Sequence, residues 1–168
     1  MFRLDYRIVY TNYDDFIGQN GFMQIRCNEY RYGEIYPKEL EVFVDKVSLY
    51  DWFERLVRVM KNLMTKDYVV LSDVESYNTW IEFQKKKGMV IISIVEAEKK
   101  QGSKDIEFSL KEPASGAWTD QVISYKQLKT EIMEKAEEYI EIISVGNTKN
   151  LRINKLKENL EFLKKYPD

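Results

Sequence analysis

Alternating apolar and polar residues predict an antiparallel meander between residues 67 and 111. Residues 106–110 alternate with the period of two that a half-buried strand requires, and residues 77–83 do the same. Between them, residues 89–95 are apolar on both parities, which is typical of a central strand that is covered on both faces for part of its length. Turns rich in lysine and glycine separate the three strands.

Further strands are expected in the N-terminal part, residues 1–46. The even positions of residues 2–10 are apolar or aromatic, which indicates a first strand. Residues 22–28 and 30–36 are predicted to form a hairpin with a tight turn. Residues 37–45 fit a strand or a helix that starts at a proline, and the pattern does not decide between the two.

Three amphipathic helices are predicted from spacing and capping residues. The first lies within residues 47–65, where Ser48 is a good N-cap, and two more fill residues 123–166, where Ser124 caps the first of them. The last helix, residues 150–165, has a narrow apolar stripe among many charges. It therefore either packs loosely on this domain or pairs with another chain.

The full pattern predicts an α+β fold in which an antiparallel meander sheet carries amphipathic helices packed on one face. A chain of 168 residues suits one domain, because it can bury roughly 70% of its unfolded surface. No repeat or linker divides the chain, so the expected domain covers residues 1–168.

The amino-acid composition excludes several classes of binding partner and indicates a location. With 26 basic and 28 acidic residues, the formal charge of −2 shows no basic excess for a nucleic-acid backbone, so nucleic acid is not expected as a partner. Apolar runs are far shorter than the roughly 18 residues of a membrane span, so no membrane is expected either. The single cysteine, Cys27, fits a reducing compartment, and the N-terminus lacks the pattern of a signal peptide. The expected location is cytoplasmic.

Catalytic equipment is scarce. The chain has no histidine, which removes Ser-His and Cys-His nucleophiles and the usual zinc sites, and it has no glycine-rich phosphate loop. No cofactor, resident metal or enzymatic activity is therefore expected. Two acidic pairs, Asp14 with Asp15 and Asp73 with Glu75, are the remaining candidates for cation binding or acid–base chemistry, and solvated turns are the plainer interpretation. Cys27 is expected to be buried and inert.

Aromatic residues suggest another use of the surface. Tyr30, Tyr32 and Tyr36 share one face of a predicted strand, and Trp80 falls on the parity opposite the core. Rigid aromatic side chains anchor protein interfaces. The alternative is that the last helix or the N-terminal hairpin covers Trp80, as ordinary second-layer core.

A family resemblance is carried by residues 72–83, Ser-Asp-Val-Glu-Ser-Tyr-Asn-Thr-Trp-Ile-Glu-Phe, in their setting. A capped helix, the strand with this Trp-Ile-Glu-Phe pattern, two more strands and the helix from Ser124 resemble small cytoplasmic immunity proteins of bacterial polymorphic toxin systems, including contact-dependent and wall-associated toxins. The resemblance implies a non-catalytic protein that binds and neutralises one cognate toxin domain, such as a nuclease. The hypothesised partner contacts are Asp14, Asp15, Asp73, Glu75, Tyr77, Trp80 and Glu82.

Two alternatives belong to other functional classes. A carboxylate-dependent metal hydrolase or nuclease would need Asp14, Asp15, Asp73 and Glu75 to converge on one metal ion. A structural or regulatory adaptor would self-associate through the helix of residues 150–165. The sequence leaves the oligomeric state open.

Overall fold

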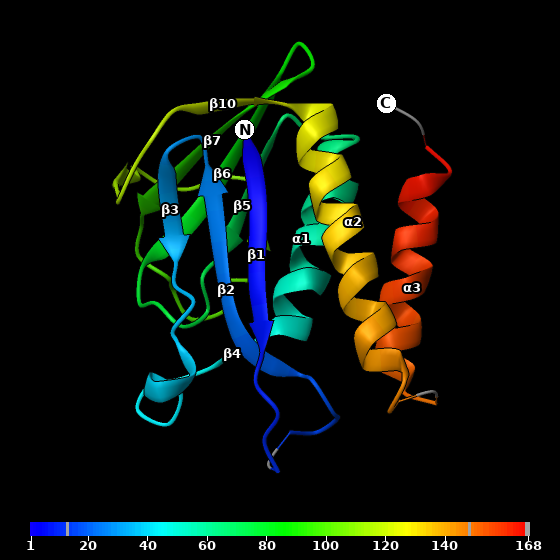
Figure 1. Ribbon diagram of the computed structural model, residues 1–168. Helices are drawn as coiled ribbons and strands as arrows, with labels where there is room; N and C mark the ends of the chain where they lie inside the picture. Colours follow the sequence, from blue (N-terminus) through cyan, green and yellow to red (C-terminus); the bar gives the residue numbers. More distant parts are fainter. Residues whose placement is uncertain (13, 148, 167–168) are drawn as a thin grey trace.

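The chain folds into two antiparallel sheets and three helices, as a computed structural model of residues 1–12, 14–147 and 149–166 shows (Figure 1). The strands occupy one side of the molecule and the two C-terminal helices the other. This arrangement is an α+β fold with antiparallel sheets, as predicted from the sequence pattern.

The first sheet, sheet A, is built from the N-terminal strands. Its order is β1-β2-β3, and β4 pairs with the start of β2. The strands are β1 (Phe2–Ile8), β2 (Asn20–Cys27), β3 (Tyr30–Gly33) and β4 (Val47–Ser48). Residues 2–8 alternate as predicted, and Leu4 lies opposite Ile25 on the buried face.

One edge of sheet A is interrupted. β3 pairs with β2 from Gln24 onward and β4 pairs with Asn20 and Gly21, so the β2 residues between these two pairings are bonded to β1 on one side and to neither β3 nor β4 on the other. Gly33 ends β3 with a φ of +77°, and a Cβ there would lie 2.4 Å from the carbonyl oxygen of Met23. Only glycine tolerates both conditions, and the chain turns away from the sheet at this point.

Sheet B contains the predicted meander with one change. Its order is β10-β7-β6-β5-β8, with β9 also paired to β7. The strands are β5 (Tyr68–Ser72), β6 (Thr79–Lys86), β7 (Met89–Glu96), β8 (Ile106–Glu107), β9 (Ala114–Ser115) and β10 (Gln121–Ser124). The predicted strand at residues 106–110 keeps only two residues and pairs with β5 rather than β7, because residues 97–105 are long enough to cross the sheet.

The three helices are α1 (Leu49–Leu63), α2 (Tyr125–Ser144) and α3 (Leu151–Lys164). Helices α1 and α2 begin at their predicted caps, and α3 begins within one residue of its expected start. The Ser48 hydroxyl accepts a hydrogen bond from the Asp51 amide, and the Ser124 hydroxyl accepts one from the Gln127 amide, at 3.3 and 3.1 Å. These bonds satisfy amides that a helix N-terminus otherwise leaves unpaired.

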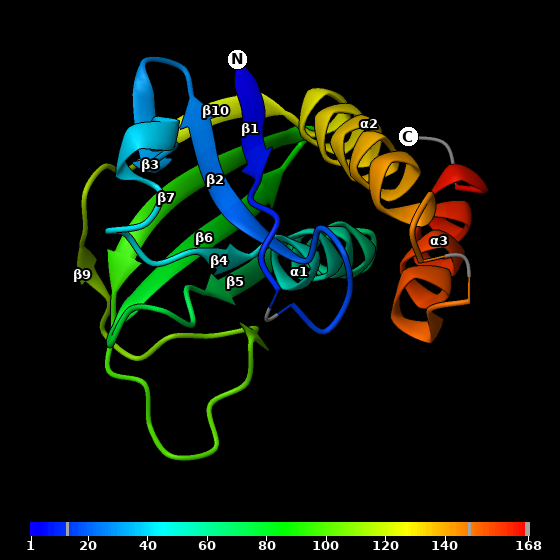
Figure 2. The ribbon, with the colours of Figure 1, turned by 60° about the horizontal axis from the view of Figure 1, so that its bottom comes forward.

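The sheets stack, and α1 closes the gap between them on one side (Figure 2). Helix α1 packs on β5 and β2, and α2 packs on β1. At the centre, the Phe53 and Tyr139 rings stack at 4.8 Å, with Tyr6 edge-on to Phe53 at 5.2 Å. One continuous core therefore joins both sheets and all three helices.

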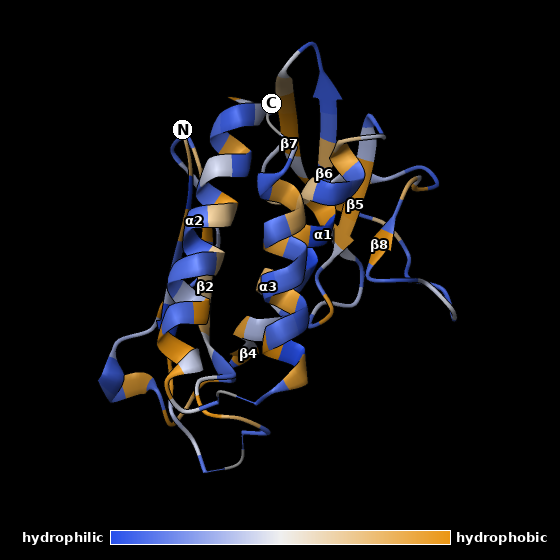
Figure 3. Cartoon of the chain, turned by 90° about the vertical axis from the view of Figure 1, so that its right-hand side faces the viewer, coloured by the Kyte–Doolittle hydropathy of each residue, from blue (hydrophilic) through white to orange (hydrophobic). Residues whose placement is uncertain are grey.

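Helix α3 packs on its own chain. Its apolar stripe lies against α1 and α2 and is at most 2% exposed (Figure 3). The stripe consists of Ile153, Leu156, Leu160 and Leu163. The stripe is therefore not free to join a second chain, which removes the basis of the self-association hypothesis. Within the described residues, no helix is long and apolar enough to cross a membrane.

Candidate functional site

The predicted contact residues fall in three separate places. Asp73, Glu75 and Tyr77 lie in the loop between β5 and β6. Trp80 and Glu82 lie on the outer face of sheet B. Asp14 and Asp15 lie in the loop between β1 and β2.

Asp14 and Asp15 shape the loop that holds them. The Asp14 carboxylate accepts hydrogen bonds from the Thr11 hydroxyl and, at 2.7 Å, from the Asn20 amide. Asp15 lies 3.8 Å from the guanidinium of Arg152 on α3. Among residues 1–12, 14–147 and 149–166, no three acidic or thiol side chains are arranged to hold a metal ion. The convergence that the hydrolase hypothesis requires is therefore not found.

Trp80 and Glu82 are buried, so their assignment as partner contacts is wrong. Trp80 is 1% exposed, and its indole N–H donates to the Ala97 carbonyl at 3.0 Å. Glu82 is 7% exposed and accepts a hydrogen bond from the Tyr68 hydroxyl at 2.7 Å. The parity was predicted correctly, but the segment after β7 covers this face, rather than the last helix or the N-terminal hairpin.

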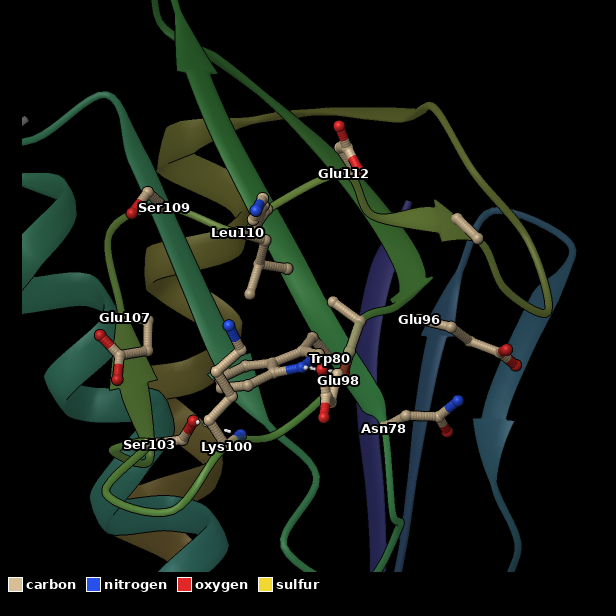
Figure 4. Close-up of a pocket in the computed structure, with 13 residues that line it drawn as sticks. Asn78, Trp80, Glu96, Glu98, Lys100, Ser103, Glu107, Ser109, Leu110 and Glu112 are labelled. Carbon is tan, nitrogen blue, oxygen red and sulfur yellow. Dashed lines mark hydrogen bonds between the residues drawn. The ribbon is translucent and has the colours of Figure 1, made fainter.

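That segment leaves a cavity of about 670 Å³ over Trp80, called here the Trp80 cavity (Figure 4). The indole forms its floor and Leu110 points toward it, while four glutamates and two lysines of residues 96–112 line the rim. The rim therefore carries an excess of negative charge, partly offset by the two lysines.

A second cavity, of about 430 Å³, opens at the interrupted edge of sheet A. We call it the acidic cavity. Four carboxylates line it, and no lysine or arginine does. Its walls come from β2, β3, β4, the connection between β3 and β4, the first turn of α1 and the β5–β6 loop. The lining residues are Phe22, Met23, Ile25, Tyr32, Gly33, Glu34, Tyr36, Asp45, Val47, Trp52, Asp73 and Glu75.

Asp73 ties the β5–β6 loop to sheet A. Its carboxylate accepts hydrogen bonds from the Tyr32 hydroxyl and, at 3.0 Å, from the Glu75 amide. Burial and the hydrogen bond to Asp73 raise the pKa of Tyr32 above its ordinary value. The Lys99 ammonium donates to the Asp73 and Ser76 carbonyls from the other side. The loop is therefore held in one conformation at the mouth of the cavity.

Glu75 has the most perturbed carboxyl group of the site. Desolvation is the main cause and the charges of Asp73 and then Asp45 add to it, while the Arg55 guanidinium opposes them; together they raise the pKa of Glu75 to about 7. The pKa of Glu75 is therefore raised first by the loss of solvent around its carboxyl group and only second by the neighbouring carboxylates.

Exposed apolar side chains flank the acidic cavity on two loops. Tyr77, two residues after Glu75, is 98% exposed, and Phe43, two residues before Asp45, is 81% exposed. Their neighbours Val42 and Val74 are also exposed. Together, Val42, Phe43, Val74 and Tyr77 form what we call the apolar rim.

Sequence reasoning missed half of this site. Glu34, Asp45 and Phe43 were not singled out, because they lie in or beside residues 37–45, whose pattern was ambiguous. The structure forms only a short 3₁₀ helix there, Lys38–Leu40, with no buried residue. The signal available in the sequence was the set of apolar residues within residues 37–45, which fits neither a buried strand nor a buried helix and therefore indicates exposed apolar side chains.

Cys27 is buried, and burial raises the pKa of its thiol to about 11, in agreement with the inert thiol that was expected. Trp52 and Trp118 lie in the core. The three tyrosines of the predicted strand are split, since β3 ends before Tyr36, whose ring packs at 5.4 Å from Phe22.

Comparison of the chain with protein-family models, with curated proteins and with solved structures found no match.

Proposed function

We propose that the chain is a non-catalytic immunity protein that binds and neutralises a cognate bacterial toxin domain, such as a nuclease, in the cytoplasm. The observation that carries the proposal is the apolar rim beside the acidic cavity, since large exposed side chains around a concave charged site are typical of protein-binding surfaces. The resemblance of residues 48–145 to immunity proteins supports the same function.

The rim and its loops suit a preformed contact surface. Tyrosine and phenylalanine bring large contact area at a small entropic cost. The β5–β6 loop that carries Tyr77 is fixed by the bonds of Asp73 and Lys99, so little of it has to be ordered on binding.

Charge favours a basic partner. Four carboxylates line the cavity without a basic residue among them, and complementary charge accelerates docking and discriminates against acidic partners. In this proposal the protein blocks the toxin by occupying its surface.

Co-expression with the C-terminal domain of the large secreted protein expected to be encoded immediately upstream tests this function. We expect growth of cells that make the toxin domain to be restored, and a 1:1 complex to be purified. Replacing Tyr77 and Phe43 together by alanine is expected to weaken the complex at least about tenfold, as loss of interface anchors does.

The matched control replaces one exposed side chain on α3 and one just after it, across the molecule from the rim: Leu151→Ala with Tyr166→Ala, which are 82% and 49% exposed. This variant is expected to bind as tightly as the wild type. Absence of any complex with the toxin domain would contradict the proposed function. Equal affinity of the two double variants for the toxin domain would contradict the assignment of the apolar rim as the binding surface.

A further inference from the structure

Lysine residues gather at one end of the molecule, where α1 and α3 end, α2 begins and β6 turns into β7 (Figure 1). This end, called here the lysine pole, consists of residues 61–67, 85–89, 125–130 and 161–166. These segments contain nine lysines, no arginine and two carboxylates, which gives a net charge of +7. Because the whole chain has a formal charge of −2, the rest of it carries −9. The small net charge therefore conceals a strong separation of charge.

Hydrogen bonds hold the four segments of the lysine pole together. The Lys85 ammonium donates to the carbonyl of the last residue of α1 at 2.6 Å. The Tyr125 amide, at the start of α2, donates to the Gly88 carbonyl at 2.9 Å. The Lys129 ammonium donates at 2.6 Å to the carbonyl two residues after α3. The segments therefore present one fixed surface.

Four lysines of this surface have no partner within the protein. Their side chains are exposed, and their ammonium groups form no hydrogen bond, ion pair or ring contact within residues 1–12, 14–147 and 149–166. The four are Lys86, Lys87, Lys126 and Lys165. The other five lysines contact carbonyl, amide, carboxylate or aromatic groups of the chain itself. Only the first four are available to a ligand.

Local stability explains neither Lys126 nor Lys87. Lys126 lies in the first turn of α2, where the helix dipole favours acidic side chains, and that turn contains no acidic residue. Lys87 has a φ of +51° in the β6–β7 turn, a conformation in which asparagine, aspartate and glycine are preferred. A bound anion, in contrast, would be attracted by both lysines and by the positive end of the α2 dipole.

The β6–β7 turn projects beyond the ends of the helices (Figure 1, Figure 3). The pairing of β5 with β6 reaches only Gln84, so Lys86 and Lys87 lie beyond it at the tip. A narrow tip formed by two antiparallel strands fits the major groove of B-form DNA, which is about 12 Å wide. A flat membrane surface would meet the tip first and leave the lysines of α2 and α3 further away. The shape of the lysine pole therefore favours a grooved polyanion.

We propose that the lysine pole binds the phosphate backbone of double-stranded DNA without regard to sequence, with the β6–β7 tip in the major groove and Lys126 and Lys165 facing phosphates beside it. Lysine acts as a point charge toward phosphate, whereas paired recognition of guanine uses arginine, which this surface lacks. The expectation that nucleic acid is no partner rested on the net charge, which averages over both ends. The inference goes beyond the proposed function and does not rest on it.

Fluorescence anisotropy of a short labelled DNA duplex, titrated with the full chain, tests the proposal without the toxin domain. We expect saturable binding at low salt, with a Kd in the micromolar range, as is usual for contacts to the backbone alone. Four phosphate contacts predict that the affinity falls about a hundredfold between about 50 and 200 mM salt.

Paired lysine variants locate the contact. Lys86→Gln with Lys87→Gln is expected to weaken DNA binding at least about fivefold and to lower the salt dependence by about two phosphate contacts. The matched control, Lys104→Gln with Lys111→Gln, removes the same charge from two exposed lysines in the segment after β7 and should bind as the wild type. All four side chains are exposed, so urea unfolding should show equal stability of the two variants.

Two results would overturn the proposal: no saturable binding of the duplex at low salt, or equal losses in both double variants. Binding to vesicles that contain phosphatidylserine, without binding to the duplex, would overturn it in favour of a membrane surface. Tighter binding to duplex RNA, whose major groove is too narrow for the tip, would overturn the placement of the hairpin. Since none of these measurements uses the toxin domain, failure here and failure of the proposed function are distinguishable.

Discussion

The Trp80 cavity and the acidic cavity differ in how far the apolar side chains around them are buried. Over the Trp80 cavity, residues 97–112 fold back on the sheet, bury the indole and satisfy its N–H. At the acidic cavity, the loops leave Tyr77 and Phe43 exposed to solvent, and the four carboxylates form no ion pair within the described part of the chain.

This difference indicates that residues around the Trp80 cavity stabilise the fold, whereas residues around the acidic cavity are available for binding. A buried tryptophan with a satisfied indole contributes to the stability of the fold, whereas an exposed tyrosine beside unpaired carboxylates contributes little to it. We therefore expect substitutions around the Trp80 cavity to change the free energy of unfolding, and substitutions around the acidic cavity to change binding.

The largest expected effect comes from Trp80→Ala. Removing a side chain that is 1% exposed leaves a void between the outer face of sheet B and the segment that covers it, and is expected to lower the free energy of unfolding by about 3–5 kcal/mol. Tyr77→Ala should change it by less than about 0.5 kcal/mol. Urea unfolding of the two variants measures both values, and similar losses would abolish the distinction between the cavities.

Helix α3 offers a second contrast. Leu156→Ala removes a side chain that is 0% exposed and should cost about 2–5 kcal/mol, whereas Leu151, 82% exposed in the first turn, should tolerate alanine with little loss. Light scattering of both variants should show the mass of the wild type. A change of mass in the Leu156→Ala variant alone would indicate that α3 contributes to an interface between chains.

A smaller effect is expected from Tyr68→Phe. This change removes the hydroxyl that donates to the buried Glu82 carboxylate at 2.7 Å. A hydrogen bond to a charged group contributes about 1.5–3 kcal/mol, so the loss should lie in this range or below. Chemical denaturation at neutral pH measures it, and an unchanged stability would show that water replaces the hydroxyl.

The smallest effect concerns pH. The pKa of Glu75 is raised from 4.5 to about 7 in the folded protein, so the native state binds this proton more tightly than the unfolded state does. Its contribution to stability is therefore present below about pH 4.5 and is lost as the pH rises through about 7. Asp73 and Asp45 face Glu75 with like charge, and Arg55 with opposite charge.

Glu75→Gln removes this titration. The variant is expected to gain stability relative to the wild type as the pH is raised across that window, as denaturation at a series of pH values shows. Parallel pH profiles of the two proteins would contradict the raised pKa. Glu112→Gln serves as the control, because Glu112 belongs to the rim of the other cavity.

Local patterns predicted most of the scaffold. Period-two alternation located β1 and β6, a continuous apolar run located β7, and the caps Ser48 and Ser124 located the starts of α1 and α2. These signals depend on neighbouring residues alone. The strand at residues 106–110 was misplaced, since the choice of its pairing partner depends on how a long connection crosses the sheet.

The site was only half predictable for the same reason. Asp73, Glu75 and Tyr77 stood out as a polar loop beside the meander, but their meeting with Glu34 and Asp45 depends on the interrupted edge of sheet A. The alternation of apolar and polar residues in β6 correctly placed Trp80 and Glu82 on the outer face of sheet B. Alternation alone does not show whether another segment of the chain covers that face.

The most direct test of the binding surface is the affinity of the cognate toxin domain for the wild type, for Tyr77→Ala with Phe43→Ala, and for Tyr166→Ala with Leu151→Ala, measured by calorimetry. The account predicts a loss of about tenfold or more for the first double variant and none for the second. Equal affinities in all three proteins would contradict it.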